Sequence, residues 1–246
     1  MKLFNTEGIV IRSQKFGDAD SILLLLTKNH GLVSAMAKGV RKLKSKNRSG
    51  VSLFSHSHFS LFPGRSMYHI NHSDSIKVFA KIYEDIQCYS VASYWGELVE
   101  AFLLNPEDSE SVFILFLTCL HALGHIPEEM LIRYFEGKLL QLLGFQPGLN
   151  FCVSCGKKQG TFHNFCGHQG GVLCSNCSAA GGRVLRVSPG SVKVLEKLLA
   201  SEPIELLRLK PSALNYQEIK SMNGAIIRHH TNKSFKSLEF LDEIQG

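Results

Sequence analysis

The sequence predicts an α+β protein with an N-terminal five-stranded OB-like β-barrel, a central and C-terminal helical bundle and a four-cysteine zinc knuckle. Three observations indicate this fold class: short apolar runs over residues 7–80, a helical period from residue 79 onward, and two Cys-x-x-Cys pairs beyond residue 150. The predicted parts are a nucleic-acid-binding barrel, a helical domain, a four-cysteine zinc-binding region, and C-terminal helices that pack on the helical domain: 1–80, 81–150, 151–183 and 184–246.

The first part of the chain contains five short segments of strand character. They are alternating or wholly apolar, and turns containing Gly, Pro or Asn separate several of them. The segments are residues 8–11, 21–27, 32–37, 52–62 and 68–78. Five short strands in so short a stretch favour a small closed barrel such as an OB-fold, and an SH3-like barrel fits the pattern almost as well.

A strongly basic stretch follows the third predicted strand. Residues 38–48 contain six cations and no acidic residue. The cations are Lys38, Arg41, Lys42, Lys44, Lys46 and Arg48. A cationic loop held at both ends by a sheet suits phosphate binding, because each neutralised phosphate releases condensed counterions. The alternative is a solvated loop that binds nothing.

The net charge of +6 is distributed unevenly along the chain. Residues 1–80 carry 12 basic and 4 acidic groups (+8), residues 81–151 carry 3 and 10 (−7), and residues 152–246 carry 12 and 7 (+5). The basic first third is therefore the part expected to attract a polyanion.

Small barrels often bind single strands by stacking bases on aromatic side chains beside a basic groove. Three aromatic residues of the predicted barrel are candidates for this role: Phe54, Phe62 and Tyr68. Core packing is the favoured role for any one of them.

From residue 79 the apolar positions recur every three or four residues, as on one face of a helix. Helix ends are indicated by Gly, Pro and acidic residues. The expected helices cover residues 79–103, 109–123, 127–143, 188–199, 216–229 and 238–244. The second is apolar nearly all round and should be central in the bundle.

Four cysteines form the most specific local pattern of the sequence. Two turns, each with cysteines three positions apart, can present four thiolates to one ion: Cys152, Cys155, Cys174 and Cys177. Four thiolates with no open position favour one structural Zn²⁺ ion. The alternatives are a reduced site without metal and an iron site. Three residues between the pairs could substitute as ligands: His163, Cys166 and His168.

The cysteine count also bears on the compartment. Seven cysteines, an odd number, without a secretory leader favour a reducing, cytoplasmic setting. The N-terminus turns polar too early for a signal peptide, and no apolar run is long enough to span a bilayer. Cys88 and Cys119 fall on helical stripes and are expected to be core thiols.

Common catalytic motifs are missing from the sequence, which predicts that the protein is not an enzyme. The chain has no Gly-x-x-x-x-Gly-Lys-Ser/Thr loop, no His-x-Glu before the cysteine pairs, and neither His-Glu-x-x-His nor Gly-x-Ser-x-Gly. Asp18 and Asp20 leave a metal-dependent nuclease as a weak alternative. Two histidine pairs could form a second metal site, although a surface or groove location is favoured: His56 with His58, and His69 with His72.

Several short motifs follow one another in a characteristic order. They are Glu-Gly-Ile-Val-Ile at 7–11, His-Gly-Leu at 30–32, Ala-Lys-Gly-Val-Arg at 37–41, Arg-Tyr-Phe-Glu at 133–136, and Leu-Gly-Phe-Gln-Pro-Gly-Leu at 143–149, just before Cys152. With the order of barrel, helices and knuckle, they resemble the bacterial DNA repair protein RecO family over nearly the whole chain. The closing segment 235–241 also resembles the family, although the Arg expected after Ser237 is absent.

The resemblance implies a non-enzymatic mediator of DNA repair and homologous recombination in the bacterial cytoplasm, nucleoid-associated and not in a membrane. Such a protein binds single- and double-stranded DNA, anneals complementary strands, works with RecR, binds the C-terminal tail of the single-stranded-DNA-binding protein, and indirectly helps to load the RecA recombinase. The six cations of residues 38–48 would hold phosphates, and the zinc would brace the C-terminal part. The acidic tail is expected at positive residues of the helical region: Arg133, Lys138, Arg208 and Lys210.

Residue chemistry alone leads to a cytoplasmic, zinc-containing protein with a barrel that binds nucleic acid. A zinc-containing RNA-binding factor of translation or ribosome assembly would share these features, because phosphate contacts do not separate RNA from DNA without 2′-hydroxyl contacts. The metal-dependent nuclease lacks support from any clustered set of carboxylates.

Overall fold

The computed structural model describes residues 3–42, 45, 47–158, 160–179 and 184–245. Contacts divide the chain into two compact units, one of residues 1–121 and 235–246 and the other of residues 122–234. The predicted α+β fold class is confirmed. The four predicted parts, with boundaries at residues 80, 150 and 183, stay a prediction.

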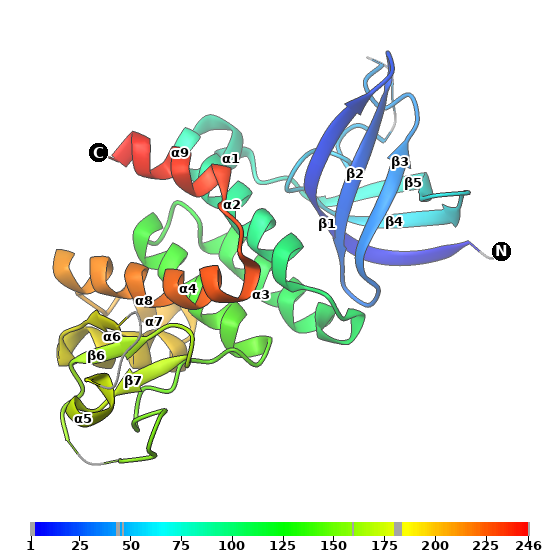
Figure 1. The fold of residues 1–246 in the computed structure, drawn as a ribbon. Helices are drawn as coiled ribbons and strands as arrows, with labels where there is room; N and C mark the ends of the chain where they lie inside the picture. Colours follow the sequence, from blue (N-terminus) through cyan, green and yellow to red (C-terminus); the bar gives the residue numbers. More distant parts are fainter. Residues whose placement is uncertain (1–2, 43–44, 46, 159, 180–183, 246) are drawn as a thin grey trace. The chain divides into compact units, whose positions relative to one another are not determined.

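Among the described residues of the first unit, five strands close into a barrel (Figure 1). They are β1 (Phe4–Phe16), β2 (Asp20–Thr27), β3 (Gly31–Ala37), β4 (His56–Pro63) and β5 (Tyr68–Lys77). The strand order is β1-β2-β3-β5-β4, and β1 pairs with β4 to complete the ring. The β3–β5 pair is parallel and the others are antiparallel. The predicted OB-like barrel is therefore confirmed.

The barrel interior follows from strand alternation, which sends every second side chain inward. Leu23 and Leu25 of β2 meet Phe59 and Leu61 of β4 in one buried cluster. Each of these four side chains is almost fully removed from water, so each contributes about 1.5–3 kcal/mol of hydrophobic stabilisation. The core therefore joins strands on opposite sides of the barrel.

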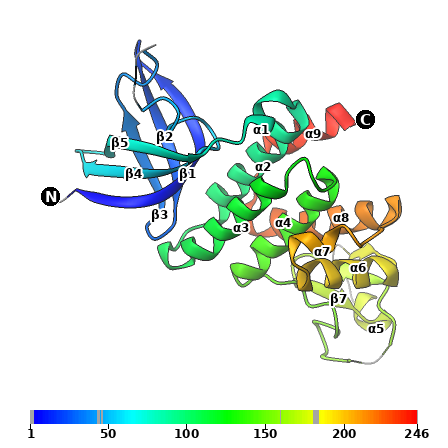
Figure 2. The same ribbon diagram turned by 180° about the vertical axis from the view of Figure 1, so that it is seen from behind.

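The helices of the first unit include one pair that the sequence predicts as a single helix. The elements are α1 (Ala80–Glu84), α2 (Ile86–Phe102), the 3₁₀ turn η1 (Pro106–Asp108), α3 (Ser109–Ala122) and α9 (Lys236–Gln245). The helix expected over residues 79–103 divides at Asp85, whose carboxylate accepts hydrogen bonds from the backbone N–H groups of Gln87 and Cys88. Helix α9 packs along α2 (Figure 2), and the Ser237 hydroxyl donates to Glu97 Oε1 at 2.9 Å.

Helix α2 also approaches the barrel closely. A Cβ atom at Gly96 would lie 3.1 Å from the carbonyl oxygen of Ile11, so glycine lets the helix backbone approach the strand. One turn further, Glu100 Oε1 lies 2.9 Å from Arg12 Nη1. Helix α2 thus packs on β1 at Ile11, and the exposed Arg12 reaches it through an ion pair.

The second unit contains helices and a small sheet. The elements are α4 (Glu128–Leu142), β6 (Asn164–Cys166), β7 (Gly171–Leu173), α5 (Ser175–Ser178), β8 (Val184–Arg186), α6 (Pro189–Ala200), α7 (Pro203–Leu206) and α8 (Ala213–Thr231). Helices α4, α6 and α8 pack on one another. Asn223 of α8 donates from Nδ2 to Glu136 Oε2 of α4 at 3.2 Å, which joins the two helices by a buried polar contact.

Strand β8, which completes a small sheet, and helix α7 were not expected from the sequence. Within the described residues, β6 pairs with both β7 and β8, and each strand has three residues. Segments this short cannot display a period of two or of 3.6 residues, so the pattern of apolar residues carries no signal for them.

Candidate nucleic-acid interface and metal centre

The basic segment, residues 38–51, leaves β3 and leads toward β4 at one end of the barrel. Its four described cations, Lys38, Arg41, Lys42 and Arg48, all have exposed side chains. Lys44 and Lys46, which the sequence also predicts as phosphate ligands, lie outside the described residues. Exposed cations on an ordered backbone are available to an anionic ligand without first breaking an internal ion pair.

The first half of the basic segment is held by the turn between β1 and β2. The N–H of Gly39 donates to Asp20 Oδ1 at 2.7 Å, and the N–H of Arg41 donates to the carbonyl of Ala19 at 2.9 Å. The Arg41 guanidinium adds a bond from Nη1 to the carbonyl of Gly17 at 3.1 Å. Between these contacts Val40 is buried in the barrel core.

The second half is held by β5. Ser73 donates its N–H to Asn47 Oδ1 at 3.2 Å and its hydroxyl to the Asn47 carbonyl at 3.3 Å. Val51 then enters the barrel core as Val40 does. Sequence reasoning missed both valines as anchors, although a single apolar residue within a polar, basic run is a usable signal.

The three aromatic candidates for base stacking differ in their surroundings. Phe54 is 1% exposed and packs edge-on against Tyr89 of α2, with ring centroids 5.9 Å apart, so it has the favoured core role and cannot stack on a base. Phe62 is exposed and lies parallel to the ring of His69 at 5.1 Å. Tyr68 is half-buried and contacts Phe4 edge-on.

The four predicted zinc ligands lie together in the second unit. The sulfur atoms of Cys152, Cys155, Cys174 and Cys177 all lie within 4.8 Å of one another. Tetrahedral Zn–S bonds of about 2.3 Å place sulfur atoms about 3.8 Å apart. Cys155 Sγ and Cys174 Sγ lie 3.8 Å apart. The donor set and its spacing therefore fit a closed four-thiolate metal site.

Two tight turns present these sulfurs. After Cys155 the chain bends at Gly156, whose φ of +74° favours glycine, and its N–H donates to the Cys152 carbonyl at 2.8 Å. The second turn opens α5, with Cys174 as the N-cap residue. Val153 donates its N–H to the carbonyl of Val172 in β7, which fastens the first turn to the small sheet.

The electrostatics of the sulfurs favour a cation. Burial raises the pKa of Cys152, but the backbone N–H groups of Cys174, Cys155 and Ser154 outweigh it and hold this pKa at about 6. At Cys177 the Ser154 hydroxyl favours the thiolate, yet the neighbouring thiols of Cys155 and Cys174 raise the pKa to about 12. Four sulfurs this close cannot all ionise without a positive ion among them.

The other cysteines lie outside this cluster. Cys166 is buried, with its sulfur 2.9 Å from His168 Nδ1, and neither residue belongs to the four-sulfur group. Cys88 and Cys119 are buried in helices, as expected for core thiols, and burial raises the pKa of Cys119.

The second metal site considered for the barrel histidines is not formed. Within the part of the chain that the structure describes, the four cysteines are the one group of three or more residues able to hold a metal. His72 Nε2 lies 3.0 Å from Asp74 Oδ1, and His56 lies 3.6 Å from Glu7 Oε2. Asp20, half of the considered nuclease pair, accepts the N–H of Gly39 instead of facing a metal.

One expected contact for an acidic tail is wrong. Arg133 is 3% exposed, and its Nη1 donates to both carboxylate oxygens of Glu136 at 3.0 and 2.9 Å. The pair lies within α4, where Asn223 of α8 contacts Glu136, and its burial leaves no room for a partner. Arg208 and Lys210 are exposed, and Lys138 lies over the Tyr134 ring at 5.6 Å.

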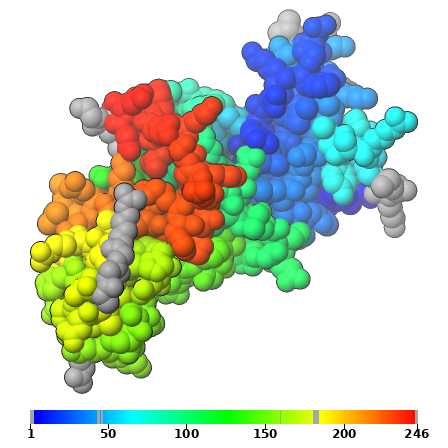
Figure 3. All heavy atoms as spheres, in the orientation of Figure 1, coloured from blue at the N-terminus to red at the C-terminus, as the bar shows by residue number. Residues whose placement is uncertain are grey.

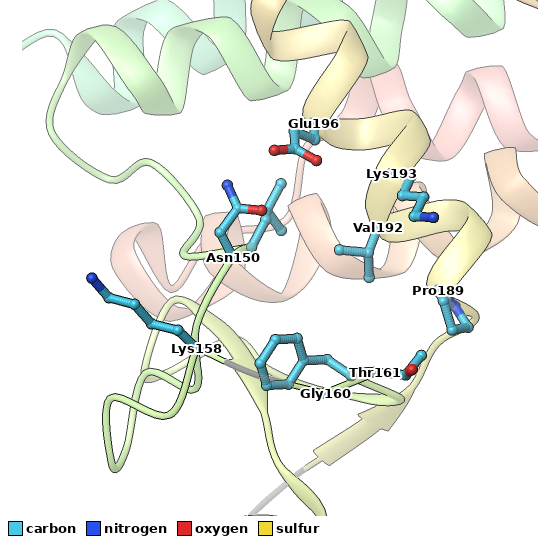
Figure 4. A pocket seen from close by; sticks show the side chains of 10 residues that line it. Asn150, Lys158, Gly160, Thr161, Pro189, Val192, Lys193 and Glu196 are labelled. Atoms are coloured by element: carbon cyan, nitrogen blue, oxygen red, sulfur yellow. The ribbon is translucent and has the colours of Figure 1, made fainter.

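A hollow of about 340 Å³ in the second unit lies between α6 and the loops near the knuckle (Figure 4). Lys193 and Glu196 of α6 line one side of it, and Asn150 and Thr161 belong to the loops that line the other. Among its described lining residues Glu196 is the one carboxylate, and no histidine, cysteine or serine accompanies it. The hollow therefore offers no acid–base pair or activated nucleophile of the usual kinds.

Two family profiles match the chain. The one described as "Recombination protein O N terminal" matches residues 1–79, and the one described as "Recombination protein O C terminal" matches residues 83–239. The chain belongs to the RecO family. The boundary between the RecO profiles falls between β5 and the end of α1, where the barrel gives way to helices.

Full-length relatives agree with this assignment. The "DNA repair protein RecO" of Symbiobacterium thermophilum is 37% identical, over 100% of this chain and 99% of the relative. Those of Alkaliphilus metalliredigens and Desulforamulus reducens are 34% and 33% identical over at least 96% of both chains. The resemblance to RecO noted in the sequence is confirmed, and the family is one of DNA repair proteins. Among the residues that the structure describes, no helix has the length and apolar character needed to cross a membrane.

Proposed function

We propose that this RecO-family protein is a non-enzymatic mediator of DNA repair and homologous recombination. It binds single- and double-stranded DNA through the basic segment, anneals complementary strands and helps to load the RecA recombinase. The observation that carries the proposal is the anchored, exposed cation set: Lys38, Arg41, Lys42 and Arg48. Lys44 and Lys46 complete the proposed phosphate-binding set.

The physical basis of annealing is charge neutralisation. Two complementary strands repel each other through their phosphates, and cations on one surface lower this repulsion while leaving the bases free to pair. Phosphate contacts carry no sequence information, which suits a protein that must anneal any pair of strands. No nucleotide hydrolysis is needed for this step.

The four cysteines hold one structural Zn²⁺ in this proposal. A closed tetrahedral site leaves no coordination position for substrate, so the ion contributes folding free energy and not catalysis. Its place in the second unit, fastened to β7, makes it a brace for the small sheet.

The proposed partners besides DNA are RecR, the acidic C-terminal tail of the single-stranded-DNA-binding protein, and indirectly RecA. An acidic tail with apolar residues needs an apolar hollow flanked by a cation. The first unit has one of about 320 Å³ between α2 and α9, lined by Ile86, Tyr89 and Phe240 with Lys236 beside them. It supports a docking site for the tail, with Lys138, Arg208 and Lys210 as the remaining sequence-based alternative.

The test removes three charges from the basic segment by Arg41→Ala, Lys42→Ala and Arg48→Ala. On single-stranded DNA, the slope of log affinity against log salt should flatten by about 2, since each lost contact accounts for about 0.7. Annealing of complementary strands coated with the single-stranded-DNA-binding protein should slow in parallel.

The matched control removes three exposed cations elsewhere, by Arg186→Ala, Lys193→Ala and Lys197→Ala, and should keep the original slope. An unchanged slope in the basic-segment variant would exclude this segment as the phosphate-binding site. Equal binding of matched RNA would favour the RNA-binding alternative, and DNA cleavage with added magnesium would favour the nuclease.

A further inference from the structure

The end of β1 carries an aromatic residue that the barrel core does not use. Phe16 is 51% exposed, the largest exposed fraction of any Phe, Tyr or Trp in the described part of the chain. It pairs with Asp20 of β2 across a turn that passes through Gly17. The β1–β2 turn lies at the upper end of the barrel in Figure 1, and atoms of β1 lie uncovered at the surface in Figure 3.

The fold does not require an apolar residue at this position. The five residues from Arg12 to Phe16 are all exposed, and the four before Phe16 are polar or charged. A phenyl ring half in water at the tip of a polar strand contributes little to the hydrophobic stabilisation of the barrel. A single exposed apolar residue is ordinary by itself, so its neighbours must decide the question.

The neighbours of Phe16 are the anchors of the basic segment. The carbonyl of Gly17, the next residue, accepts the bond from Arg41 Nη1 at 3.1 Å. The carbonyl of Ala19 accepts the N–H of Arg41, and Asp20 accepts the N–H of Gly39. The same turn that ends in Phe16 therefore positions the cations that follow β3.

The charges around the ring favour an anion. Three exposed cations lie on the segment that meets this turn: Lys38, Arg41 and Lys42. Lys15 precedes Phe16 in β1, so its side chain points to the opposite face of the strand. Two carboxylates oppose them, Asp18 in the turn and Asp20, which is engaged with Gly39. An exposed aromatic face among cations is the arrangement by which proteins hold single strands, with phosphates on the cations and an unpaired base on the ring.

We propose that Phe16 is a base-stacking residue of the phosphate-binding site formed by the basic segment. The inference rests on the proposed DNA binding and deepens it, because it names unpaired bases as part of what the site binds. Bases of a duplex are already stacked on one another and cannot reach the ring without melting. Phe16 therefore favours single strands over duplexes, whereas the cations serve both.

The experiment compares Phe16→Ala, Phe16→Leu and Phe16→Tyr in the full-length protein. Affinity is measured for a single strand containing 2-aminopurine, a base whose fluorescence falls on stacking, and for the matched duplex. Loss of the ring in the Ala and Leu variants should weaken single-strand binding about 5- to 100-fold and abolish the fluorescence change. Duplex affinity should stay within about twofold and the salt slope should not change, because no charge is removed. The Tyr variant should keep both single-strand properties.

Phe151→Ala is the matched control, since Phe151 is 42% exposed but lies in the second unit and not in the barrel. It should leave both affinities unchanged, and a loss confined to this control would overturn the assignment to Phe16. Full single-strand affinity in Phe16→Ala, or equal losses on single strands and duplex, would also overturn it.

The charge variant Arg41→Ala with Lys42→Ala separates this inference from the proposed function. If that variant loses affinity and salt dependence while Phe16→Ala has no effect, the stacking role of Phe16 is refuted and the basic segment remains the proposed DNA site. Full affinity in the charge variant refutes the basic segment as the DNA site, and the stacking role with it. Melting temperatures are measured for every variant, and Phe16→Ala should match the unchanged protein because the ring is exposed.

Discussion

The basic segment and the four-cysteine cluster are built in similar ways but differ in what the fold completes. In both, the fold fixes the chain at particular residues. Burial of Val40 and Val51 in the core holds the basic segment, and the turn at Gly156, closed by a backbone hydrogen bond, holds the knuckle. The cations of the basic segment are fully formed ligand groups without any ligand. The sulfur of Cys177 is not, because the neighbouring thiols of Cys155 and Cys174 raise its pKa and oppose its ionisation. Removing cations from the basic segment should therefore weaken DNA binding, whereas removing a sulfur from the cluster should lower the stability of the fold.

The largest expected effect tests the stability side of this comparison. Cys174→Ser should release the zinc and lower the unfolding free energy by more than about 3 kcal/mol, because metal binding is coupled to folding of the small sheet. Elemental analysis should find one zinc per unchanged chain, and urea unfolding gives the stability. Cys166→Ser is the control: its sulfur lies outside the four-sulfur group, so the zinc should remain. A Cys174→Ser protein with full zinc and unchanged unfolding would remove the distinction between the two regions.

A smaller effect is expected where the basic segment meets β5. A Cβ atom at Gly50 would lie 2.7 Å from Ser73 Oγ and 2.9 Å from Ser73 Cβ. Either the segment at Gly50 or strand β5 at Ser73 must therefore shift. Gly50→Ala should cost about 1–3 kcal/mol of unfolding free energy and weaken DNA binding, since the cations move with the backbone. Ser49→Ala, at the exposed neighbouring position, is the control and should change neither. If Gly50→Ala keeps full stability, the anchoring at this end is weaker than the geometry indicates.

The smallest expected effect is the pH dependence of stability that arises from His56 in the barrel. Burial lowers the pKa of His56 below its usual 6.5 and outweighs the attraction of the Glu7 carboxylate. The folded state therefore takes up this proton less readily than the unfolded state. Stability should be full above pH 6.5 and fall as the pH drops through that value toward the lower folded-state pKa.

Denaturant midpoints at several pH values measure this dependence. His56→Gln should reduce the loss of stability at acid pH, while His58→Gln, at an exposed position, should not. Burial also lowers the pKa of His230 in the second unit, so the informative quantity is the difference between the two variants. Equal acid sensitivity in both would assign the effect to groups other than His56.

The barrel strands and the four-cysteine cluster could be predicted from short patterns in the sequence. Alternating or wholly apolar runs located the barrel strands, and the spacing of Cys152, Cys155, Cys174 and Cys177 located the sulfur cluster. Each of these patterns involves only a few neighbouring residues, so the prediction does not depend on contacts with distant parts of the chain.

The remaining features depend on contacts between distant segments. Arg133 reads as a surface cation, but Glu136 and Asn223 bury it. Phe54 lies in an apolar, strand-like run, yet it precedes β4 with a φ of +60° and packs on α2. Phe16 reads as one more strand residue, and its exposure becomes visible only when the other strands are in place. In these cases tertiary contacts decide a role that composition and periodicity leave open.

The two buried valines also make the surface chemistry of the barrel separable from its architecture. Val40 and Val51 act as two staples, and the described cations between them, Arg41, Lys42 and Arg48, are exposed and lie outside the hydrophobic interior. The exposed cations Lys42 and Arg48 can therefore be regarded as an exchangeable cassette, at which an engineer could alter the charge or attach a fluorescent label, provided that the contacts of Arg41, Asn47 and Gly50 are kept. Natural variation at these exposed positions would retune ligand preference at little cost to folding.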